Sequence, residues 1–455
     1  MSKGRTWRNG TLVYTAGGLA VLFLWLMWGD FAYSMKDRAT GTVAALMLKK
    51  FDVSDFLFGI IMISFPNFTN IFLCPIVSYR SDRHRGRFGR RIPYLLLTTP
   101  FIVIGLAGLG FTPLLARLIR QAVGAEHISY NLTALLVFCF FWIILDFGTT
   151  LAGAIFNALA TDVVPTEFLG RFFAMFRAVS LGCAFLFNYF VMGYAETHAL
   201  VIFLGLAALY GIGLFSICLK VKEGTYPPVE PEEEKAGGFS AAAKNYFVEC
   251  FGHPFYRWVI LAYVTCGLAN IPFNAYTIFY AKSIGVDMDA VGKYLAITYL
   301  ISLCLSYFLG MLADRFHPLR CGITVMLLYG ISCLVSGIFI RGEAGFAAAL
   351  IAHTVLSGTY FTLTASLLLR LFPQSRFAQY QSAQGILGTL AMIFVVPLIG
   401  KLIDLSGNYR LIFYAGALLA LLTAMLLFVC YRRFRQYGGP DHYTPPEPEN
   451  FPNAH

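Results

Sequence analysis

The segment ALVIFLGLAALYGIGLFSICL, residues 199–219, contains no charged side chain and is long enough to decide the class of fold. About 20 apolar residues in a helix cross a hydrocarbon core of roughly 30 Å. Backbone groups in lipid must pair with one another, so a spanning segment is either a helix or a strand of a closed barrel. Residues 199–219 and 411–430 lack the polar–apolar alternation of a barrel strand. The sequence therefore predicts transmembrane helices.

Similar apolar segments recur along the 455 residues, of which 58% are hydrophobic and only 13% charged. A soluble protein carries roughly 25% charged residues, so the composition favours an all-α integral membrane protein. We expect twelve spanning helices in two sets of six. The first set is predicted near residues 13–36 (or 13–48), 56–79, 93–115, 132–160, 171–193 and 198–219, and the second near 256–281, 290–312, 321–340, 345–370, 379–402 and 409–431.

The charges between these segments predict the orientation in the membrane. With both termini in the cytoplasm, the cytoplasmic side carries roughly twice as many Lys and Arg residues as the other side, as the positive-inside rule requires. This bias accounts for the net charge of +10 without a nucleic-acid partner. The predicted domains are an N-terminal bundle of residues 1–219, a cytoplasmic linker of residues 220–255, a C-terminal bundle of residues 256–437 and a disordered cytoplasmic tail of residues 438–455.

Two sequence landmarks recur at matching places in the two sets of helices. SYRSDRHRGRFGRRIP follows the second helix at residues 78–93, and GMLADRFHPLR follows the eighth at residues 310–320. VPTEFLGRF, residues 164–172, and FPQSRF, residues 372–377, follow the fourth and tenth helices. Matched landmarks of this kind indicate internal duplication. The predicted architecture is therefore two pseudo-symmetric bundles of six helices.

The loop at residues 78–93 resembles the signature between helices 2 and 3 of the major facilitator superfamily. Its pattern SDRxxxRFGRRxP is similar to the plant sucrose transporters and the glycoside–pentoside–hexuronide:cation symporters. Residues 146–162, DFGTTLAGAIFNALATD, are similar to helix 4 of sucrose transporters, and residues 29–32, GDFA, resemble helix 1 of melibiose permeases. The resemblance implies the major facilitator fold and secondary transport of a small solute, chiefly a sugar. The C-terminal half resembles these families only in layout.

Asp146 is the clearest candidate for coupling transport to an ion. An ionisable side chain inside a span is expensive, and it marks a water-filled cavity or a charge pair. Asp146 has no charged neighbour within fifteen residues on either side, and Gly153 and Asn157 share its helix face. The resemblance to sucrose transporters implies that this aspartate takes part in proton coupling. A carboxylate capped by nearby hydroxyls, without a role in transport, is the alternative.

The expected partner of Asp146 differs from the pattern of the sucrose transporters. Their arginine is replaced here by Asn157, and we expect Arg177 to substitute, although an arginine at this depth also fits a side chain that reaches for the membrane surface. Melibiose permeases place two helix 2 carboxylates in their sodium site, where this sequence has Asn70 and Cys74. We therefore expect protons rather than sodium to be the coupling ion.

The first helix leaves two interpretations open. If it ends near residue 35, Lys36, Asp37 and Arg38 belong to an external loop. If it continues to residue 48, Asp30 and Asp37 share one face of a long cavity-lining helix, with Lys36 and Arg38 to balance them. The predicted coupling residues are Asp146, Asp30, Asp37 and Arg177.

The basic loops also predict a cytoplasmic gate. In the superfamily that they resemble, such loops form a charge clamp that links helix ends, and charge-assisted bonds from arginine to carboxylates stabilise one of two packings. Plain anchoring by positive charge is the alternative. The expected gate residues are Asp82, Arg83, Arg87, Gly89, Arg90, Arg91, Asp162, Glu167 and Arg171 in the first half, and the sparser Asp314 and Arg315 in the second.

Solute contacts are expected from aromatic faces and amide side chains, because sugars present both C–H surfaces and hydroxyl groups. The predicted solute residues are Trp28, Phe31, Asn157, Asn270, Asn274, Tyr360 and Gln384. A buried, hydrogen-bonded histidine is the expected state of His353.

Other classes of protein fit the sequence less well. It contains neither a zinc-protease motif nor a nucleotide-binding loop, so we predict neither an enzyme nor an ATP-driven pump, and no metal or cofactor. The leading prediction is proton-coupled symport of a sugar or glycoside by a monomer in the cell membrane, which would be the inner membrane in a bacterium. An organic-acid or drug antiporter of the same fold is the alternative.

Overall fold

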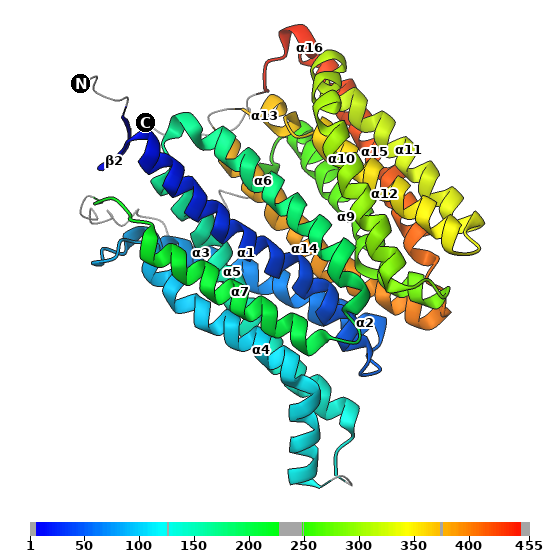
Figure 1. The fold of residues 1–455 in the computed structure, drawn as a ribbon. Coiled ribbons are helices and arrows are strands. Elements are labelled where there is room, and N and C mark those ends of the chain that lie inside the picture. Colours follow the sequence, from blue (N-terminus) through cyan, green and yellow to red (C-terminus); the bar gives the residue numbers. More distant parts are fainter. Residues whose placement is uncertain (1–5, 125–126, 227–247, 249, 374–375, 447–455) are drawn as a thin grey trace. The chain divides into compact units, whose positions relative to one another are not determined.

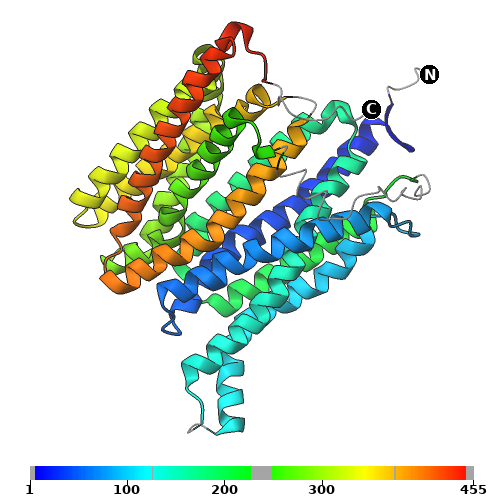
Figure 2. The ribbon, with the colours of Figure 1, turned by 180° about the vertical axis from the view of Figure 1, so that it is seen from behind.

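The computed structural model describes residues 6–124, 127–226, 248, 250–373 and 376–446. The chain divides into two compact units, residues 1–231 and 232–455. Each unit is built almost entirely from long helices (Figures 1 and 2). Eleven of the described helices are long and apolar enough to cross a membrane, and α10 (Met288–Phe316) is a twelfth long helix.

The N-terminal unit contains the six long helical segments that the sequence predicts. They are α1 (Ala16–Lys49), α2 (Asp55–Gly59) continuing through a π turn (Ile60–Ser64) into α3 (Phe65–Arg83), α4 (Ile92–Val123), α5 (Tyr130–Val163), α6 (Leu169–Leu186) with further turns to Tyr194, and α7 (Ala199–Lys220). A two-stranded hairpin of β1 (Trp7–Asn9) and β2 (Leu12–Tyr14) precedes them.

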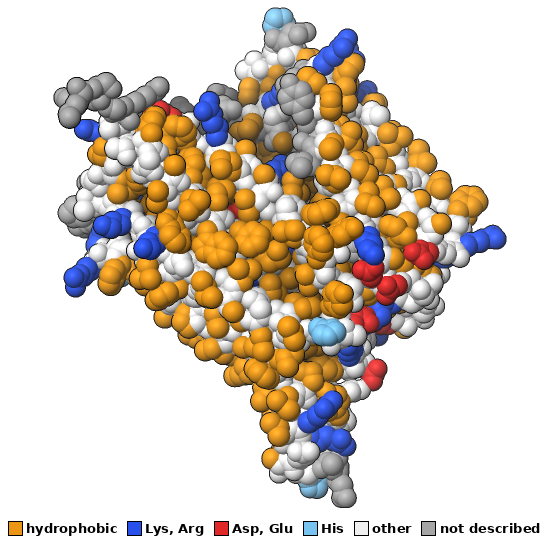
Figure 3. Space-filling view, viewed as in Figure 1, with side chains coloured by type: hydrophobic (Ala, Val, Ile, Leu, Met, Phe, Trp, Pro, Cys, Tyr) orange, Lys and Arg blue, Asp and Glu red, His pale blue; other side chains and the backbone are white. Residues whose placement is uncertain are grey.

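The C-terminal unit repeats this layout with six further long segments. They are α9 (Pro254–Ser283), α10, α11 (Pro318–Phe339), α12 (Glu343–Leu363) followed by the short α13 (Leu367–Leu371), α14 (Phe377–Ser406) and α15 (Leu411–Gln436), before a last turn, α16 (Gly439–His442). On the face shown in Figure 3, hydrophobic side chains cover most of the helices, as expected for surfaces that contact lipid.

Helix α1 decides between the two interpretations of the first span, because it continues to Lys49. The apolar residues after the charged cluster, such as Val43 and Leu46, are fully buried in the unit. Packing along this second half holds the helix together through the cluster. Lys36 and Asp37 are therefore helical residues in the middle of a long span.

Helices α4 and α5 are longer than predicted, and their linked ends project beyond the other helices of the unit (Figures 1 and 2). Two glycines of α4 allow the pair to approach closely. A Cβ atom on Gly108 would lie 2.0 Å from Phe141, and one on Gly105 would lie 2.8 Å from Leu145. Only glycine permits this distance between the two backbones.

Three segments differ from their predicted form or lie outside the described residues. Residues 438–446 of the expected disordered tail pack on the C-terminal unit, where the Tyr443 hydroxyl donates to the Leu371 carbonyl at 2.7 Å and the Tyr256 hydroxyl donates to the Pro446 carbonyl at 2.8 Å. Aromatic contacts of Tyr443 with Phe255 and Phe434 explain this order. The rest of the tail, and residues 227–247 and 249 of the linker, are outside the description.

Candidate functional site

A cavity of about 440 Å³ lies inside the N-terminal unit, between α1, α3 and α5. About half of its lining residues are polar, although every wall comes from a helix that is apolar enough to span a membrane. The polar lining residues are Tyr33, Lys36, Asp37, Thr40, Asn67, Asn70, Asp146, Thr149 and Thr150. A polar cavity at this depth can hold water, an ion or a solute.

Lys36 supplies the cation of this cavity and is only 2% exposed. Its ammonium group donates to the Thr149 hydroxyl at 3.3 Å and lies 3.8 Å from an oxygen of Asp37. It also lies 4.6 Å from the ring centre of Tyr33, a distance that allows a cation–π interaction. Burying an unpaired ammonium is costly, so this set of partners is what keeps Lys36 inside the unit.

Asp146 supplies the opposite charge and is 9% exposed. Its carboxylate accepts a hydrogen bond from the Thr69 hydroxyl at 2.6 Å and interacts electrostatically with Lys36. Thr69 lies on α3 and Lys36 on α1, so the carboxylate on α5 joins three helices. The acid and the base share one cavity, with a hydroxyl on either side.

The π turn before α3 helps to position this wall of the cavity. The Trp142 indole on α5 donates to the Ile61 carbonyl inside the turn at 2.9 Å. Such turns leave backbone groups without their regular helical partners, and they are common at functional sites. Trp142 lies one helical turn before Asp146 on α5. Its bond to Ile61 therefore holds α5 against the π turn close to Asp146.

The four predicted coupling residues lie in different surroundings in the structure. Asp146 and Asp37 line the cavity, and Asp37 is 59% exposed there. Asp30 is buried but is not among the lining residues, and one of its carboxylate oxygens has no hydrogen-bond partner in the described chain. Arg177 is exposed on α6, and no described contact links it to Asp146.

Lys36, and not Arg177, is thus the cation beside Asp146, which corrects the expectation for its partner. The sequence suggested Lys36 only as a balance for Asp30 and Asp37. Its position halfway along an apolar helix was a usable signal, because a lysine there must either pair or face water. Choosing Asp146 as its partner required knowledge of how α1 packs beside α5.

The solute residues predicted in the N-terminal unit lie away from the charged pair. Trp28 and Phe31 stack at 5.9 Å between ring centres, and Trp28 is partly exposed. Asn157 is exposed and donates to the Gly153 carbonyl one turn earlier at 3.1 Å. None of these three residues lines the cavity.

The solute residues predicted in the C-terminal unit range from exposed to fully buried. Asn274 is exposed and Gln384 is half-buried, whereas Tyr360 is fully buried. Asn270 is also buried and donates to the Cys266 carbonyl at 3.0 Å. Asn274 contacts His353, which is itself buried and hydrogen-bonded, as the sequence led us to expect.

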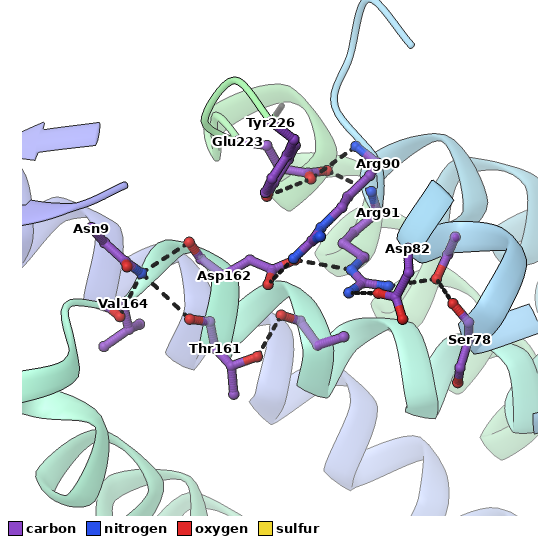
Figure 4. Close-up of polar contacts among 12 residues, drawn as sticks. Asn9, Ser78, Asp82, Arg90, Arg91, Thr161, Asp162, Val164, Glu223 and Tyr226 are labelled. Atoms are coloured by element: carbon purple, nitrogen blue, oxygen red, sulfur yellow. Dashed lines mark hydrogen bonds and ion pairs between the residues drawn. The ribbon is translucent and has the colours of Figure 1, made fainter. Parts of the chain in front are cut away.

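Several of the predicted gate residues meet at one end of the N-terminal unit (Figure 4). Arg90 donates to both oxygens of Asp162, at 2.9 and 2.6 Å, and Arg91 donates to one of them at 2.9 Å. Arg91 also pairs with Asp82 and donates to the Ser81 hydroxyl at 2.5 Å. Two arginines that share one carboxylate tie the start of α4 to the ends of α3 and α5.

Glu223 is a member of this cluster that sequence reasoning missed, because it lies in the expected linker. Its carboxylate accepts the backbone N–H groups of Arg90, Arg91 and Ile92 at 2.7–2.9 Å, and so caps the N-terminus of α4. Gly89 makes room for it: its φ angle is +98°, and a Cβ atom there would lie 2.5 Å from Glu223 Cδ. The start of the linker is therefore fixed to the N-terminal unit.

Tyr226 closes the cluster on the side of the linker. Its hydroxyl donates to Glu223 at 3.2 Å, and its ring centre lies 4.0 Å from the Arg90 guanidinium. Burial, followed by the charges of Asp162 and Glu223, raises the pKa of the Tyr226 hydroxyl above its ordinary value. The hydroxyl therefore remains a donor at neutral pH.

The N-terminal hairpin, which the sequence did not predict, covers the neighbouring end of α5. The Asn9 amide donates to the carbonyls of Asp162 and Val164, both at 2.9 Å, and so satisfies acceptors that the helix end leaves open (Figure 4). Trp7 packs against Phe168 with 5.5 Å between ring centres. The hairpin thus holds the residues around Asp162 in place.

The remaining predicted gate residues lie outside this cluster. Arg83 bonds to the Tyr79 hydroxyl, whereas Arg87, Glu167 and Arg171 are exposed. Glu223 therefore takes the acceptor role expected of Glu167. In the second half, Arg315 is exposed near the Phe316 ring, and the side chain of Asp314 is outside the described residues.

Metal ligands do not gather in the part of the chain that the structure describes. No group of three or more His, Cys, Asp or Glu side chains there could hold a metal ion. The ten cysteines are free thiols.

Comparison with known proteins identifies the architecture. A family model described as Major Facilitator Superfamily matches residues 259–454. A crystal structure of a bacterial homologue of the iron transporter ferroportin, in an inward-facing state, has a TM-score of 0.68 at 14% sequence identity and covers 90% of this chain and 99% of that chain. The chain has the major facilitator fold. The predicted fold class is therefore confirmed.

Other structures with the major facilitator fold are transporters of different solutes. The D-xylose–proton symporter has a TM-score of 0.61 at 15% identity, covering 90% of this chain and 97% of that chain. The nucleoside transporter NupG has a TM-score of 0.63 at 10% identity, covering 90% and 99%. No curated protein matches the sequence. At these identities the likeness establishes the fold, and the resemblance to sucrose transporters stays a prediction.

Proposed function

We propose that this chain is a secondary transporter that moves a sugar or glycoside across the cell membrane together with a proton, by alternating access of its two six-helix units. Both termini lie in the cytoplasm in this proposal. The observation that carries it is the buried pair of Lys36 and Asp146 in a polar cavity of the N-terminal unit. Structures of this fold include a D-xylose–proton symporter.

The pair can couple a proton to transport because Lys36 has two acidic neighbours. While Asp146 is ionised, the Lys36 ammonium interacts with it across the cavity, and Asp37 lies 3.8 Å away on the more exposed side. A proton on Asp146 cancels that attraction and leaves Lys36 with Asp37 and Thr149. The two protonation states of Asp146 thus favour different positions of α1 relative to α5, which is the kind of bistable contact that a coupled motion needs.

The same residues favour a proton over sodium. Asn70 and Cys74 line the cavity at the positions where melibiose permeases, which the sequence resembles, carry carboxylates. The buried ammonium of Lys36, which lines the same cavity and interacts electrostatically with Asp146, would repel a second cation. Sodium binds through several oxygen ligands, whereas a proton needs only the carboxylate itself.

The cluster around Asp162 would act as the cytoplasmic gate in this proposal. It joins the ends of α3, α4 and α5 and the start of the linker by charge-assisted bonds. Such bonds stabilise one packing of the helix ends, and their loss allows the other. We propose that this cluster outweighs its C-terminal counterpart at Asp314 and Arg315.

One observation favours a second candidate, the carrier of an organic acid. A buried lysine in a cavity can bind the carboxylate of a solute as well as the carboxylate of Asp146. A POT family transporter in complex with 5-aminolevulinic acid has the same fold, with a TM-score of 0.65 at 14% identity. Asp146 would then compete with the solute for Lys36.

Uptake into proteoliposomes separates these candidates. Purified protein is reconstituted and supplied with radiolabelled sucrose, melibiose, D-xylose, uridine or 5-aminolevulinic acid, under an imposed pH gradient, a sodium gradient or neither. The proposal predicts that a sugar accumulates only under the pH gradient. Accumulation of 5-aminolevulinic acid alone would support the organic-acid carrier, and accumulation driven by sodium would contradict proton coupling.

A further inference from the structure

Three polar side chains form a hydrogen-bonded chain inside the C-terminal unit, each from a different helix. The Tyr329 hydroxyl on α11 lies 2.7 Å from His353 Nδ1 on α12. His353 Nε2 lies 3.2 Å from the side-chain oxygen of Asn274 on α9. His353 is 4% exposed and stacks on Phe273 with 3.8 Å between ring centres, so its orientation is fixed.

The donors and acceptors along this chain give it a direction. The Asn274 oxygen can only accept, so His353 Nε2 carries the proton and donates to it. In a neutral histidine the other nitrogen, Nδ1, then accepts, and the Tyr329 hydroxyl supplies the proton. Other groups that could accept from Tyr329 are the Ala269 carbonyl, which is more distant at 3.4 Å, and the Cys333 sulfur. The chain therefore ends with the two N–H donors of the Asn274 amide pointing away from His353.

Asn274 is also the exposed end of the chain. Its neighbours on α9 are mostly buried, whereas Asn274 lies on a narrow accessible stripe with Gly267, Ile271 and Ile278. An amide on a spanning helix rarely faces lipid, because its polar groups would have no partners there. The exposed side of Asn274 therefore faces water or a solute.

We propose that Asn274 is a hydrogen-bond donor to an oxygen atom of the solute, and that His353 and Tyr329 are positioning residues that hold its amide in the donating orientation. This inference rests on the proposed transport function for its ligand, but the hydrogen-bond chain itself does not. A donor of this kind suits hydroxyl, ring or carbonyl oxygens, as in sugars and nucleosides. It does not select for a charged solute.

The protonation pattern is tested without any solute. The protein is labelled with 15N-histidine and placed in nanodiscs, and the His353 signals are assigned by their loss in His353→Gln among the eight histidines of the chain. We expect the neutral form with the proton on Nε2. A proton on Nδ1 would reverse the chain, turn the oxygen of Asn274 outward and overturn the proposal.

The role in binding is tested by kinetics with the solute of highest uptake among sucrose, melibiose, D-xylose and uridine. Asn274→Ala and His353→Leu should raise KM about tenfold and change the maximal rate less than twofold. His353→Gln should restore KM to within threefold, because a glutamine can donate to Asn274 and accept from Tyr329 at once. Tyr329→Phe should give an intermediate KM.

Thr423→Val is the matched control. Thr423 on α15 is buried like His353, but its hydroxyl donates to the Leu419 carbonyl of its own helix. Its KM should equal that of the wild type. An unchanged KM in Asn274→Ala, or a His353→Gln variant as weak as His353→Leu, would refute the positioning role. If the wild-type protein takes up none of the four solutes, the proposed function fails. The histidine spectrum still tests the direction of the hydrogen bonds from Tyr329 through His353 to Asn274.

Discussion

The polar interiors of the two units differ in charge, although their helices follow the same layout. The buried side chains of the N-terminal unit include five charged ones: Asp30, Lys36, Asp55, Arg91 and Asp146. In the described part of the C-terminal unit, no buried side chain is an acid, a lysine or an arginine, and the polar ones are threonines, Asn270 and His353. A repeated fold therefore does not imply repeated chemistry.

The difference suggests a division of labour between the units. A buried charge can change its protonation state and move a helix, whereas buried hydroxyls, an amide and a neutral histidine offer fixed donors and acceptors. The N-terminal unit is thus suited to ion coupling and gating, and the C-terminal unit to orienting a neutral solute. The first three of the following predictions compare one unit with the other.

The largest effect is expected from removing the buried cation. Lys36→Met leaves Asp146 without its cationic partner, so the carboxylate should hold its proton permanently. We expect accumulation driven by a pH gradient to fall at least a hundredfold in the proteoliposome assay. Lys293→Met on α10 is the control, because Lys293 is exposed and pairs with Asp289 one turn away. Normal accumulation by Lys36→Met would contradict the proposed coupling role of the buried charges in the N-terminal unit.

A smaller loss is expected from the charge cluster at the end of the N-terminal unit. Asp162→Asn removes the carboxylate that Arg90 and Arg91 share, and such charged hydrogen bonds contribute about 1.5–3 kcal/mol each. The melting temperature of the purified protein should drop by several degrees. Asp289→Asn in the other unit breaks an exposed pair worth less than about 0.5 kcal/mol and should leave it unchanged. Equal shifts in the two variants would argue against a dominant N-terminal cluster.

Two glycines provide a comparison of backbone effects. Gly89→Ala places a side chain at a positive φ angle and against Glu223, which should destabilise the protein by about 1–2 kcal/mol. Gly385→Ala on α14 meets open space in a helix and should stabilise it by up to about 1 kcal/mol. Chemical denaturation of both variants in detergent measures the difference. A neutral Gly89→Ala would show that Glu223 is not held against the loop.

The smallest effect is a dependence of stability on pH in the C-terminal unit. Burial, followed by the charges of Arg370 and Arg320, lowers the pKa of His317 to about 4. Unfolded histidine has a pKa near 6.5, so between about pH 6.5 and 4 the unfolded chain takes up a proton that the folded chain does not. Stability should therefore fall as the pH drops through this range.

His317→Asn should flatten that dependence. Asparagine tolerates the positive φ angle of 66° at this position and can accept the N–H of Leu319, as His317 does. Melting curves of the two proteins at pH 7, 5.5 and 4 provide the measurement. Parallel decreases in both proteins would assign the acid sensitivity to other groups.

Much of the helical layout could be predicted from the sequence, because each span is a long apolar segment whose length is set by the bilayer. The second half of α1 was left open, since a cluster of three charges reads equally well as a loop until its burial is known. Packing of α1 against the rest of the unit decided the matter. The extension of α4 to Val123 could not be predicted in this way, because its residues after Ala116 are mostly exposed and project beyond the other helices.

Two acidic residues of the site could be predicted from the sequence, whereas the residues that contact them could not. Asp146 and Asp162 stand out as charges in or near apolar segments, but Lys36 and Glu223 act through contacts between residues far apart in the chain. Glu223 follows α7 directly, and its role as a cap of α4 depends on how those two helices end side by side. The N-terminal hairpin is too short to produce a recognisable strand pattern.

Gradient-driven uptake by Asp146→Asn tests the central claim most directly. Proteoliposomes containing this variant are compared with the wild type for accumulation under a pH gradient and for exchange of internal and external solute at equal pH. If the charge pair in the N-terminal unit couples the proton, the variant exchanges solute but no longer accumulates it. Accumulation at the wild-type level would contradict the claim and leave Asp146 with a structural role.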